Sequence, residues 1–332
     1  MSRSTTLLIW INEHTMWVIL FILFTLNAIF TDQFFIYGNI INILFHSTIL
    51  AMLALGLGLT LLTGNFDLSI ESTMAFSPAV AALIMTHWVP GFSPYLAILI
   101  TFIIGIFIGI FNGLCIAKLS INPFLQTLSM LIILRGLTLF MIPLSIYNLP
   151  SAYCFLGGER IIGNIPIALF FTFFVFVVMH ILLESTVFGR SIIAIGGNSE
   201  ASFKRGIRTA RITILTFAIS GLLASAAGLL ATGRQAAVTN IMGQGMVFEA
   251  FAAAVLGGVS LKGGSGSVTG MIAGVLILGI INNSLTLLGV SPYLIYATKG
   301  FLIFIAILID RNRINVRNML FHREEMKYVN VS

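Results

Sequence analysis

The chain has 332 residues, of which 58% are hydrophobic and only 8% are charged, and its mean hydropathy is +1.06. These values exclude a water-soluble protein, because soluble domains carry about 25% charged residues. A transmembrane helix takes roughly 20 apolar residues, so the chain holds apolar sequence for about ten crossings and leaves no room for a separate soluble domain. We therefore expect a single all-α integral membrane domain over residues 1–332.

The basic residues indicate how the chain is oriented. There are 17 basic and 11 acidic residues, which give a formal net charge of +6. Membrane proteins collect Lys and Arg in cytoplasmic segments, and with a cytoplasmic N-terminus the external segments hold only Arg160 and Arg234. This distribution predicts that both termini are cytoplasmic. It also explains the positive charge through topology, so we expect contact with membrane lipid and none with nucleic acid.

About ten apolar segments are predicted to cross the membrane as helices, because backbone amides in lipid must be satisfied within the segment. The predicted spans are residues 16–31, 40–63, 68–86, 95–118, 123–143, 164–183, 212–232, 247–261, 268–288 and 293–309. The third span contains Glu71 and Pro78, and the eighth is short and Gly-rich, so either could be re-entrant. Residues 310–332 are predicted to form a cytoplasmic tail.

The two halves of the chain share a sequence pattern. Residues 110–114 (IFNGL) precede residues 122–125 (NPFL) and Arg135, whereas residues 281–285 (INNSL) precede residues 291–294 (SPYL) and Lys299. Five spans in each half, over about 16–143 and 164–309, would give the halves opposite orientations. Such inverted repeats place a substrate path at their interface. A chance match of short apolar strings is the alternative.

The longest polar interruption between spans is the predicted cytoplasmic loop 184–211. Asn198 or Ser199 can cap a short helix there, Glu200 suits its first turn, and Gly206 can adopt the left-handed conformation that ends it. A helix of two turns is marginal alone in water, so we expect it to dock on another subunit. A solvated basic loop that only sets the topology is the alternative.

Within this loop, residues 188–201 (FGRSIIAIGGNSEA) resemble the coupling-loop signature of ribose-type permeases of ATP-binding-cassette sugar importers. Other motifs of that family occur in the expected order along the chain, at residues 64–72 (GNFDLSIES), 112–136, 248–270 and 281–300. The resemblance covers about residues 40–309. The chain departs from it at Asn65 and Glu71, where the family usually has Gly, and at Lys262, where it usually has a small residue.

The resemblance implies a type II importer-like fold in the bacterial inner membrane. It implies a homodimer or paired permease, a cytoplasmic ATP-binding-cassette ATPase and an extracytoplasmic sugar-binding protein as partners. It places ATPase coupling at Gly196, Gly197, Asn198, Glu200 and Ala201. Residues 263–270 (GGSGSVTG) lack the Lys of a Walker A loop, so ATP and Mg²⁺ are expected in the ATPase and no cofactor in this chain. Cys115 and Cys154 match no metal-ligand spacing, so no metal site is expected.

Ionisable and amide side chains inside spans are costly and tend to face a cavity or a partner. Amides and carboxylates can hydrogen-bond to sugars, so the candidates for a translocation path are Glu71, Asn112, Gln126, Arg135, Glu249, Asn282 and Asn283. The alternative is that amides join helices and that Arg135 and Lys299, at equivalent repeat positions, pair with Glu or with helix ends. Arg160 and Arg234 are candidate contacts for acidic groups of a binding protein, or are Arg residues that the topology tolerates.

We therefore expect a permease subunit that carries a pentose or hexose with energy from a separate ATPase. An autoinducer-2-type importer remains open within the same permease group. A secondary transporter also has inverted repeats and intramembrane charges, but it needs no ATPase. An intramembrane enzyme is disfavoured, because no HExxH or GxSxG motif occurs and the span residues His46 and His180 are expected to stand alone.

Overall fold

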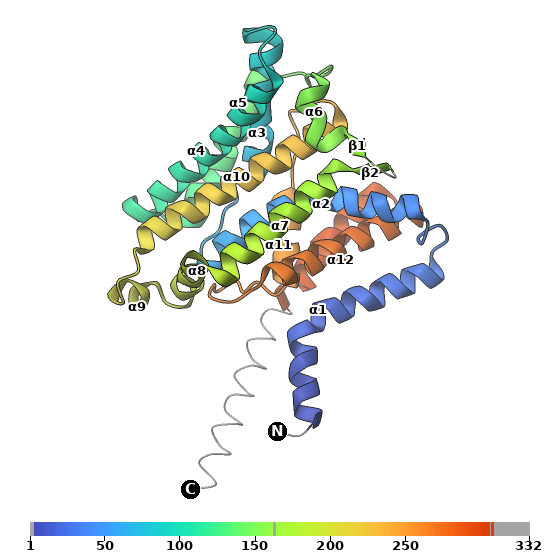
Figure 1. Ribbon diagram of the computed structural model, residues 1–332, viewed down its shortest axis with the longest axis vertical. Helices are drawn as coiled ribbons and strands as arrows, with labels where there is room; N and C mark the ends of the chain where they lie inside the picture. The colour runs from blue at the N-terminus through green and yellow to red at the C-terminus, as the bar shows by residue number, and fades with distance from the viewer. Residues whose placement is uncertain (1–2, 162–163, 306, 309–332) are drawn as a thin grey trace.

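The computed structural model describes residues 3–161, 164–305, 307 and 308. Within these residues the protein is helical apart from a short hairpin (Figure 1). Six helices are long and apolar enough to cross a membrane, namely α2 (Tyr37–Leu62), α4 (Pro94–Leu119), α5 (Pro123–Met141), α7 (Ile167–Ser185), α10 (Thr209–Gln235) and α12 (Val268–Leu287). The predicted tail at 310–332 lies outside the described residues. The all-helical membrane class is therefore confirmed.

The remaining predicted spans correspond to helices that do not meet this criterion of length and apolar composition. α1 (Arg3–Phe30) is apolar over Met16–Phe30, and the last described helix is Pro292–Ile305. α3 (Ile70–Leu83) continues as the π-helix η1 (Ile84–Trp88), and α11 (Met246–Leu256) has only 11 residues. The predicted end of the eighth span at residue 261 is wrong. The helix ends earlier because two glycines follow Leu256, and Gly258 adopts a φ of +92°.

The segment before α7 contains structure that the sequence pattern did not predict. α6 (Ser151–Gly158) is followed by β1 (Arg160–Ile161), which pairs antiparallel with β2 (Ile165–Pro166). The predicted start of the sixth span at residue 164 is therefore wrong, because residues 165 and 166 form the second strand of this hairpin. α6 is held by Tyr153, whose fully buried hydroxyl lies 2.9 Å from the Thr101 hydroxyl of α4.

The predicted cytoplasmic loop 184–211 also differs from its prediction, since it holds two helices instead of one. α8 (Val187–Gly197) precedes α9 (Ser199–Lys204), and Asn198 separates them. The Thr186 hydroxyl accepts a hydrogen bond from Gly189 N at 3.2 Å and so caps α8. The sequence predicted a helix cap only at Asn198 or Ser199, so the prediction missed α8, which is capped by Thr186.

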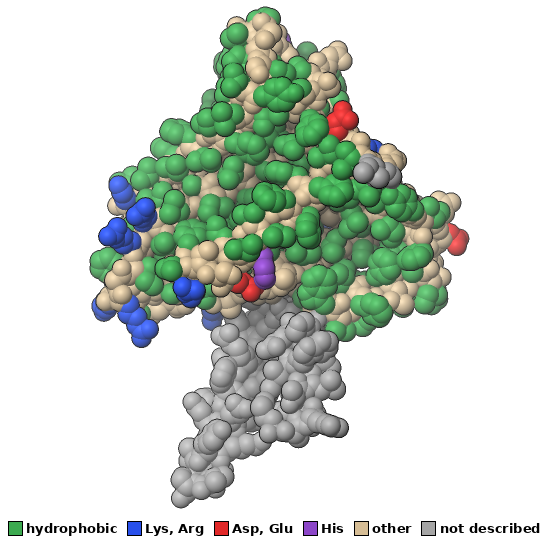
Figure 2. Space-filling view, in the orientation of Figure 1, with side chains coloured by type: hydrophobic (Ala, Val, Ile, Leu, Met, Phe, Trp, Pro, Cys, Tyr) green, Lys and Arg blue, Asp and Glu red, His purple; other side chains and the backbone are tan. Residues whose placement is uncertain are grey.

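α2 and α10 form the centre of the molecule (Figure 1). Their apolar stretches are 78% and 72% buried, compared with 17% for α5. α10 packs against α3 and α4, and α2 packs against α11 and α12. α4 approaches α10 closely because Gly105 faces Gly221 and a Cβ on either would collide with the other's backbone. The outer helices carry many exposed large hydrophobic side chains (Figure 2), as a lipid-facing surface requires.

Candidate functional site

A polar cavity of about 720 Å³ lies among α2, α10, α11, α12 and the helix Pro292–Ile305. This volume is within the range of small-molecule sites, about 300–1,000 Å³. Its polar lining residues are His46, Ser47, Arg234, Gln235, Glu249, Asn282, Asn283, Thr286, Thr298 and Lys299. Three of the residues predicted for the path, Glu249, Asn282 and Asn283, are therefore brought together here.

An ion pair crosses from α11 to the last described helix at this cavity. Lys299 Nζ donates to Glu249 Oε1 at 2.8 Å, and both side chains are partly exposed. Glu249 lies in the first turn of α11, where the helix dipole favours a carboxylate. The alternative in which Lys299 pairs with a Glu is confirmed. Because both residues also line the cavity, a solute there meets a carboxylate and an ammonium group side by side.

The two neighbouring amides of α12 have different surroundings. Asn283 Nδ2 donates to Asn39 Oδ1 at 2.8 Å, and Asn39 Nδ2 donates back to Asn283 Oδ1 at 3.1 Å. This reciprocal pair joins α2 to α12. The Asn282 side chain is exposed to the cavity and makes no side-chain hydrogen bond to another described residue. Of these two amides of α12, Asn282 is therefore the one that is available to a solute.

Glu71 and Arg135 form a second ion pair, at 3.4 Å, which binds the segment before α11. Glu71 Oε2 accepts hydrogen bonds from Gly245 N at 2.9 Å and Val247 N at 3.4 Å. Arg135 Nη1 donates to the carbonyl of Met242 at 3.0 Å. Neither charged side chain lines the cavity, whereas Met242 does. The pair therefore fixes the position of the backbone from Met242 to Gly245, and Met242 in this segment lines the cavity.

Asn112 and Gln126 belong to a buried network on the other side of α10. Gln126 Nε2 donates to Asn112 Oδ1 at 3.2 Å, and Asn112 Nδ2 donates to Ser69 Oγ at 3.0 Å. Ser69 and Ser220 both donate to the fully buried Asp67, at 2.6 and 2.7 Å. These two amides do not line the cavity, and their contacts join α4 and α5 to the start of α3.

Arg160 and Arg234 meet at the aromatic ring of Phe45. Their guanidinium carbons lie 5.9 and 5.4 Å from its centroid, which is cation–π distance. Among the described residues, neither guanidinium has a carboxylate within ion-pair distance. Arg234 was expected in an external loop, but α10 continues through Gln235 and places Arg234 in its last turn, at the cavity.

The expectation that His46 and His180 stand alone is wrong. Arg234 Nη2 lies 2.9 Å from His46 Nε2, and since Arg has no acceptor, the histidine nitrogen accepts the hydrogen bond. His180 Nδ1 lies 3.3 Å from a Glu184 carboxylate oxygen, one helical turn away. Sequence reasoning missed His46 because its partner is far along the chain. The signal that could have found this contact is Arg234, a basic residue close to the end of a predicted span, which needs a polar partner nearby.

The predicted short helix after Asn198 is confirmed, together with its cap and its glycine stop. Asn198 Oδ1 accepts from Ala201 N at 2.8 Å, Lys204 pairs with Glu200 at 2.7 Å, and Gly206 adopts a φ of +87°. The predicted coupling residues Gly197, Asn198, Glu200 and Ala201 are exposed, whereas Gly196 is packed against other backbone. Figure 2 shows basic side chains gathered at this end of the molecule, where Lys204, Arg205, Arg208 and Arg211 are exposed.

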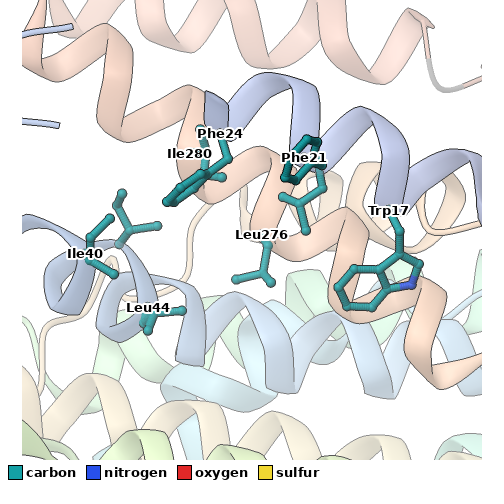
Figure 3. A pocket seen from close by; sticks show the side chains of 9 residues that line it. Trp17, Phe21, Phe24, Ile40, Leu44, Leu276 and Ile280 are labelled. Carbon is teal, nitrogen blue, oxygen red and sulfur yellow. The ribbon is translucent and has the colours of Figure 1, made fainter. Parts of the chain in front are cut away.

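A second cavity, of about 380 Å³, lies between α1, α2 and α12. Figure 3 shows its lining, which consists of apolar side chains, among them Trp17, Phe21, Phe24 and Leu276. It offers almost no hydrogen-bonding group, so it does not suit a polyhydroxylated solute. The polar cavity is the better candidate for a translocation site.

Comparison with known proteins identifies the family. Residues 39–308 match the family model described as "Branched-chain amino acid transport system / permease component". The chain belongs to this permease family. It is therefore a multi-pass membrane permease component and a transport subunit, as the motifs at residues 64–72, 112–136, 188–201, 248–270 and 281–300 predicted.

Individual relatives agree along most of the chain. The ribose import permease protein RbsC of Bacillus subtilis is 38% identical over 296 residues, which cover 89% of this chain and 91% of the relative. The galactose/methyl galactoside import permease protein MglC of Salmonella typhimurium is 33% identical, with coverages of 93% and 96%. The L-arabinose transport system permease protein AraH of Escherichia coli is 32% identical, with coverages of 91% and 91%. No solved structure matches the chain.

Proposed function

We propose that the permease is the membrane subunit of an ATP-driven, binding-protein-dependent importer that carries a monosaccharide, a pentose or a hexose, across the bacterial inner membrane. The polar cavity carries this proposal. Glu249, Asn282 and Thr298 supply a carboxylate, an amide and a hydroxyl to one space, and Lys299 adds a donor. These are the groups that a polyol requires, and the names of the relatives support a pentose or hexose.

The proposed architecture has about ten crossings in two inverted five-helix repeats, as in type II importers, with both termini cytoplasmic. Two sets of contacts support it. Glu71 pairs with Arg135 in the first half as Glu249 pairs with Lys299 in the second, and each Glu lies in the first turn of a short helix. α10 packs on α3 and α4 as α2 packs on α11 and α12, which are the equivalent helices of the opposite halves.

The proposed ATPase site is the α8–α9 surface, with ATP and Mg²⁺ bound by the ATPase and no cofactor in this chain. Its exposed Phe203 and basic residues are suited to an apolar pocket with an acidic rim. A second permease copy or a paired permease completes the assembly. ATP binding and hydrolysis would move α9, and the permeases would alternate between outward and inward openings.

The proposed contact for the sugar-binding protein is the pair Arg160 and Arg234 at Phe45. These guanidinium groups lie close together and have no carboxylate partner among the described residues. Acidic side chains on a binding protein would offset their charge and set its orientation. Because Arg234 also lines the cavity, a binding protein that docks on Arg234 would change the surroundings of a solute in the cavity.

Uptake by the reconstituted complex tests the proposal. The permease is purified with its co-purifying ATPase and binding protein and placed in proteoliposomes, and uptake of labelled ribose, arabinose, galactose and autoinducer-2 is measured. We expect uptake of one sugar, only with ATP. Replacing Ala201 with Trp should abolish uptake and leave the amount of permease in the membrane unchanged. Uptake driven by an ion gradient without an ATPase would instead identify a secondary transporter, and uptake of autoinducer-2 alone would select the other ligand.

A further inference from the structure

A compact contact joins α8 to the loop between α11 and α12, residues 257–267. Gly264 N donates to the Leu62 carbonyl at the end of α2, at 3.0 Å. A Cβ added to Gly264 would lie 2.7 Å from Gly197 N, and one added to Gly263 would lie 2.7 Å from Gly64 N. We call residues 62–64, 196–197 and 263–264 the glycine junction.

No side chain separates the backbones at this junction. A Cβ on Gly196 would collide with the Leu62 carbonyl and with Gly264 N. Gly263 and Gly264 adopt φ values of +81° and +74°, which L side chains rarely allow. Backbone packed this closely cannot absorb a displacement by rotating a side chain, so a movement of one segment must shift the next.

The segments that meet here lead in two directions. On the cytoplasmic side, α8 ends at Gly197 and passes through Asn198 into the exposed α9. On the other side, the loop connects α11, which carries Glu249, to α12, which carries Asn282. α2, which ends at Leu62, carries His46. The junction therefore stands between the docking helix and three helices that line the polar cavity.

We propose that the glycine junction transmits displacement of α8 and α9 to the α11–α12 loop and so changes access to the polar cavity. This inference rests on the proposed function, because the displacement originates in an ATPase docked on α9. Gly196 and Gly264 are positioning residues in this scheme and touch no solute. Because they lack a side chain, the backbone of α8 contacts the α11–α12 loop directly and can displace it. Their small size therefore serves transmission of motion as well as packing.

Access to the cavity provides the readout. Thr286, which lines the cavity, is replaced by Cys in a variant where Cys115 and Cys154 are Ala, and its maleimide labelling rate is measured in the complex with and without ATP. Gly196→Ala and Gly264→Ala are compared with Gly38→Ala, a helical glycine with no atom within 4 Å of its added Cβ. We expect ATP to change the rate in the control, and this change to shrink about 2- to 30-fold in the junction variants. The ATPase should still co-purify and hydrolyse ATP.

The outcomes separate this inference from the proposed function. If no ATPase co-purifies with the unaltered permease, the proposed function fails. If it co-purifies and both junction variants respond to ATP as the control does, the inference is overturned and the proposed function stands. Hydrogen–deuterium exchange of residues 257–267 in the unaltered complex needs no variant. ATP should change exchange in this loop, and unchanged exchange while Thr286→Cys labelling responds to ATP would also overturn the inference.

Discussion

Glu71 and Asn282 illustrate how two polar residues in similar apolar surroundings take different roles. Glu71 is buried, and its oxygens pair with Arg135 and accept hydrogen bonds from backbone amides where α11 begins. Asn282 is exposed to the cavity without a side-chain partner among the described residues. Both were equally plausible solute contacts in the sequence. The partners of Glu71 lie far away along the chain, and the cavity at Asn282 is formed by distant helices, so only the fold distinguishes the two residues.

Glu71→Gln should destabilise the permease by about 1–3 kcal/mol, because Arg135 loses its carboxylate partner while keeping carbonyl partners. The preference for one sugar over another should not change. Unfolding of the purified permease and competition between sugars during uptake measure the two effects. The exposed Glu159 provides the control as Glu159→Gln, which should be neutral. A changed sugar preference with unchanged stability would place Glu71 in the path instead.

Asn282→Ala should raise the KM for sugar uptake about 2- to 12-fold, the value of one hydrogen bond. Asn283→Ala should instead reduce stability, because it leaves Asn39 without its amide partner. Uptake kinetics and thermal unfolding of both variants check this contrast. Equal KM increases in the two variants would contradict the assignment of Asn282 as the available amide.

Among the elements, the short helices differ in what determines them: local sequence signals predict α9, whereas tertiary contacts stabilise α6. The N-cap, the acidic first turn and the glycine stop predicted α9 directly. α6 and the hairpin carry no comparable signal. α6 is stabilised by burial of Tyr153 and by its close contact with α10, where Gly157 meets the backbone at Leu230. Periodicity cannot detect an element that is held by such distant residues.

Asn198→Ala should weaken α9 by about 1 kcal/mol, because it removes the acceptor for Ala201 N. We expect weaker association with the ATPase. If α9 must be folded to dock, the loss of about 1 kcal/mol raises the Kd for the ATPase about fivefold. The neighbouring Ser199→Ala, which alters no side-chain hydrogen bond among the described residues, is the control. Equal ATPase retention by the two variants during purification would argue against a docked α9.

For the whole molecule, the orientation of the chain has a direct test. Phe203→Cys on α9 should react with a membrane-impermeant maleimide only from the cytoplasmic side, and Tyr147→Cys only from outside, since both positions are exposed. Burial raises the pKa of the native Cys154 thiol, so its reactive thiolate is scarce at neutral pH and increases as the pH rises. Background labelling of Cys154 should therefore be low at pH 7. The reverse labelling pattern would invert the proposed topology.

Composition, apolar run length and the separated motifs determined the membrane class, most of the spans and the permease family, because these properties depend on residues close together in the chain. Tertiary structure decided which polar residues share a cavity. Arg234 joined His46 and Lys299 joined Glu249 only when distant helices packed together. The glycine junction likewise depends on backbones from three separate parts of the chain. Hydrogen bonds and close packing act over a few ångströms, and the fold alone sets which residues come within that range.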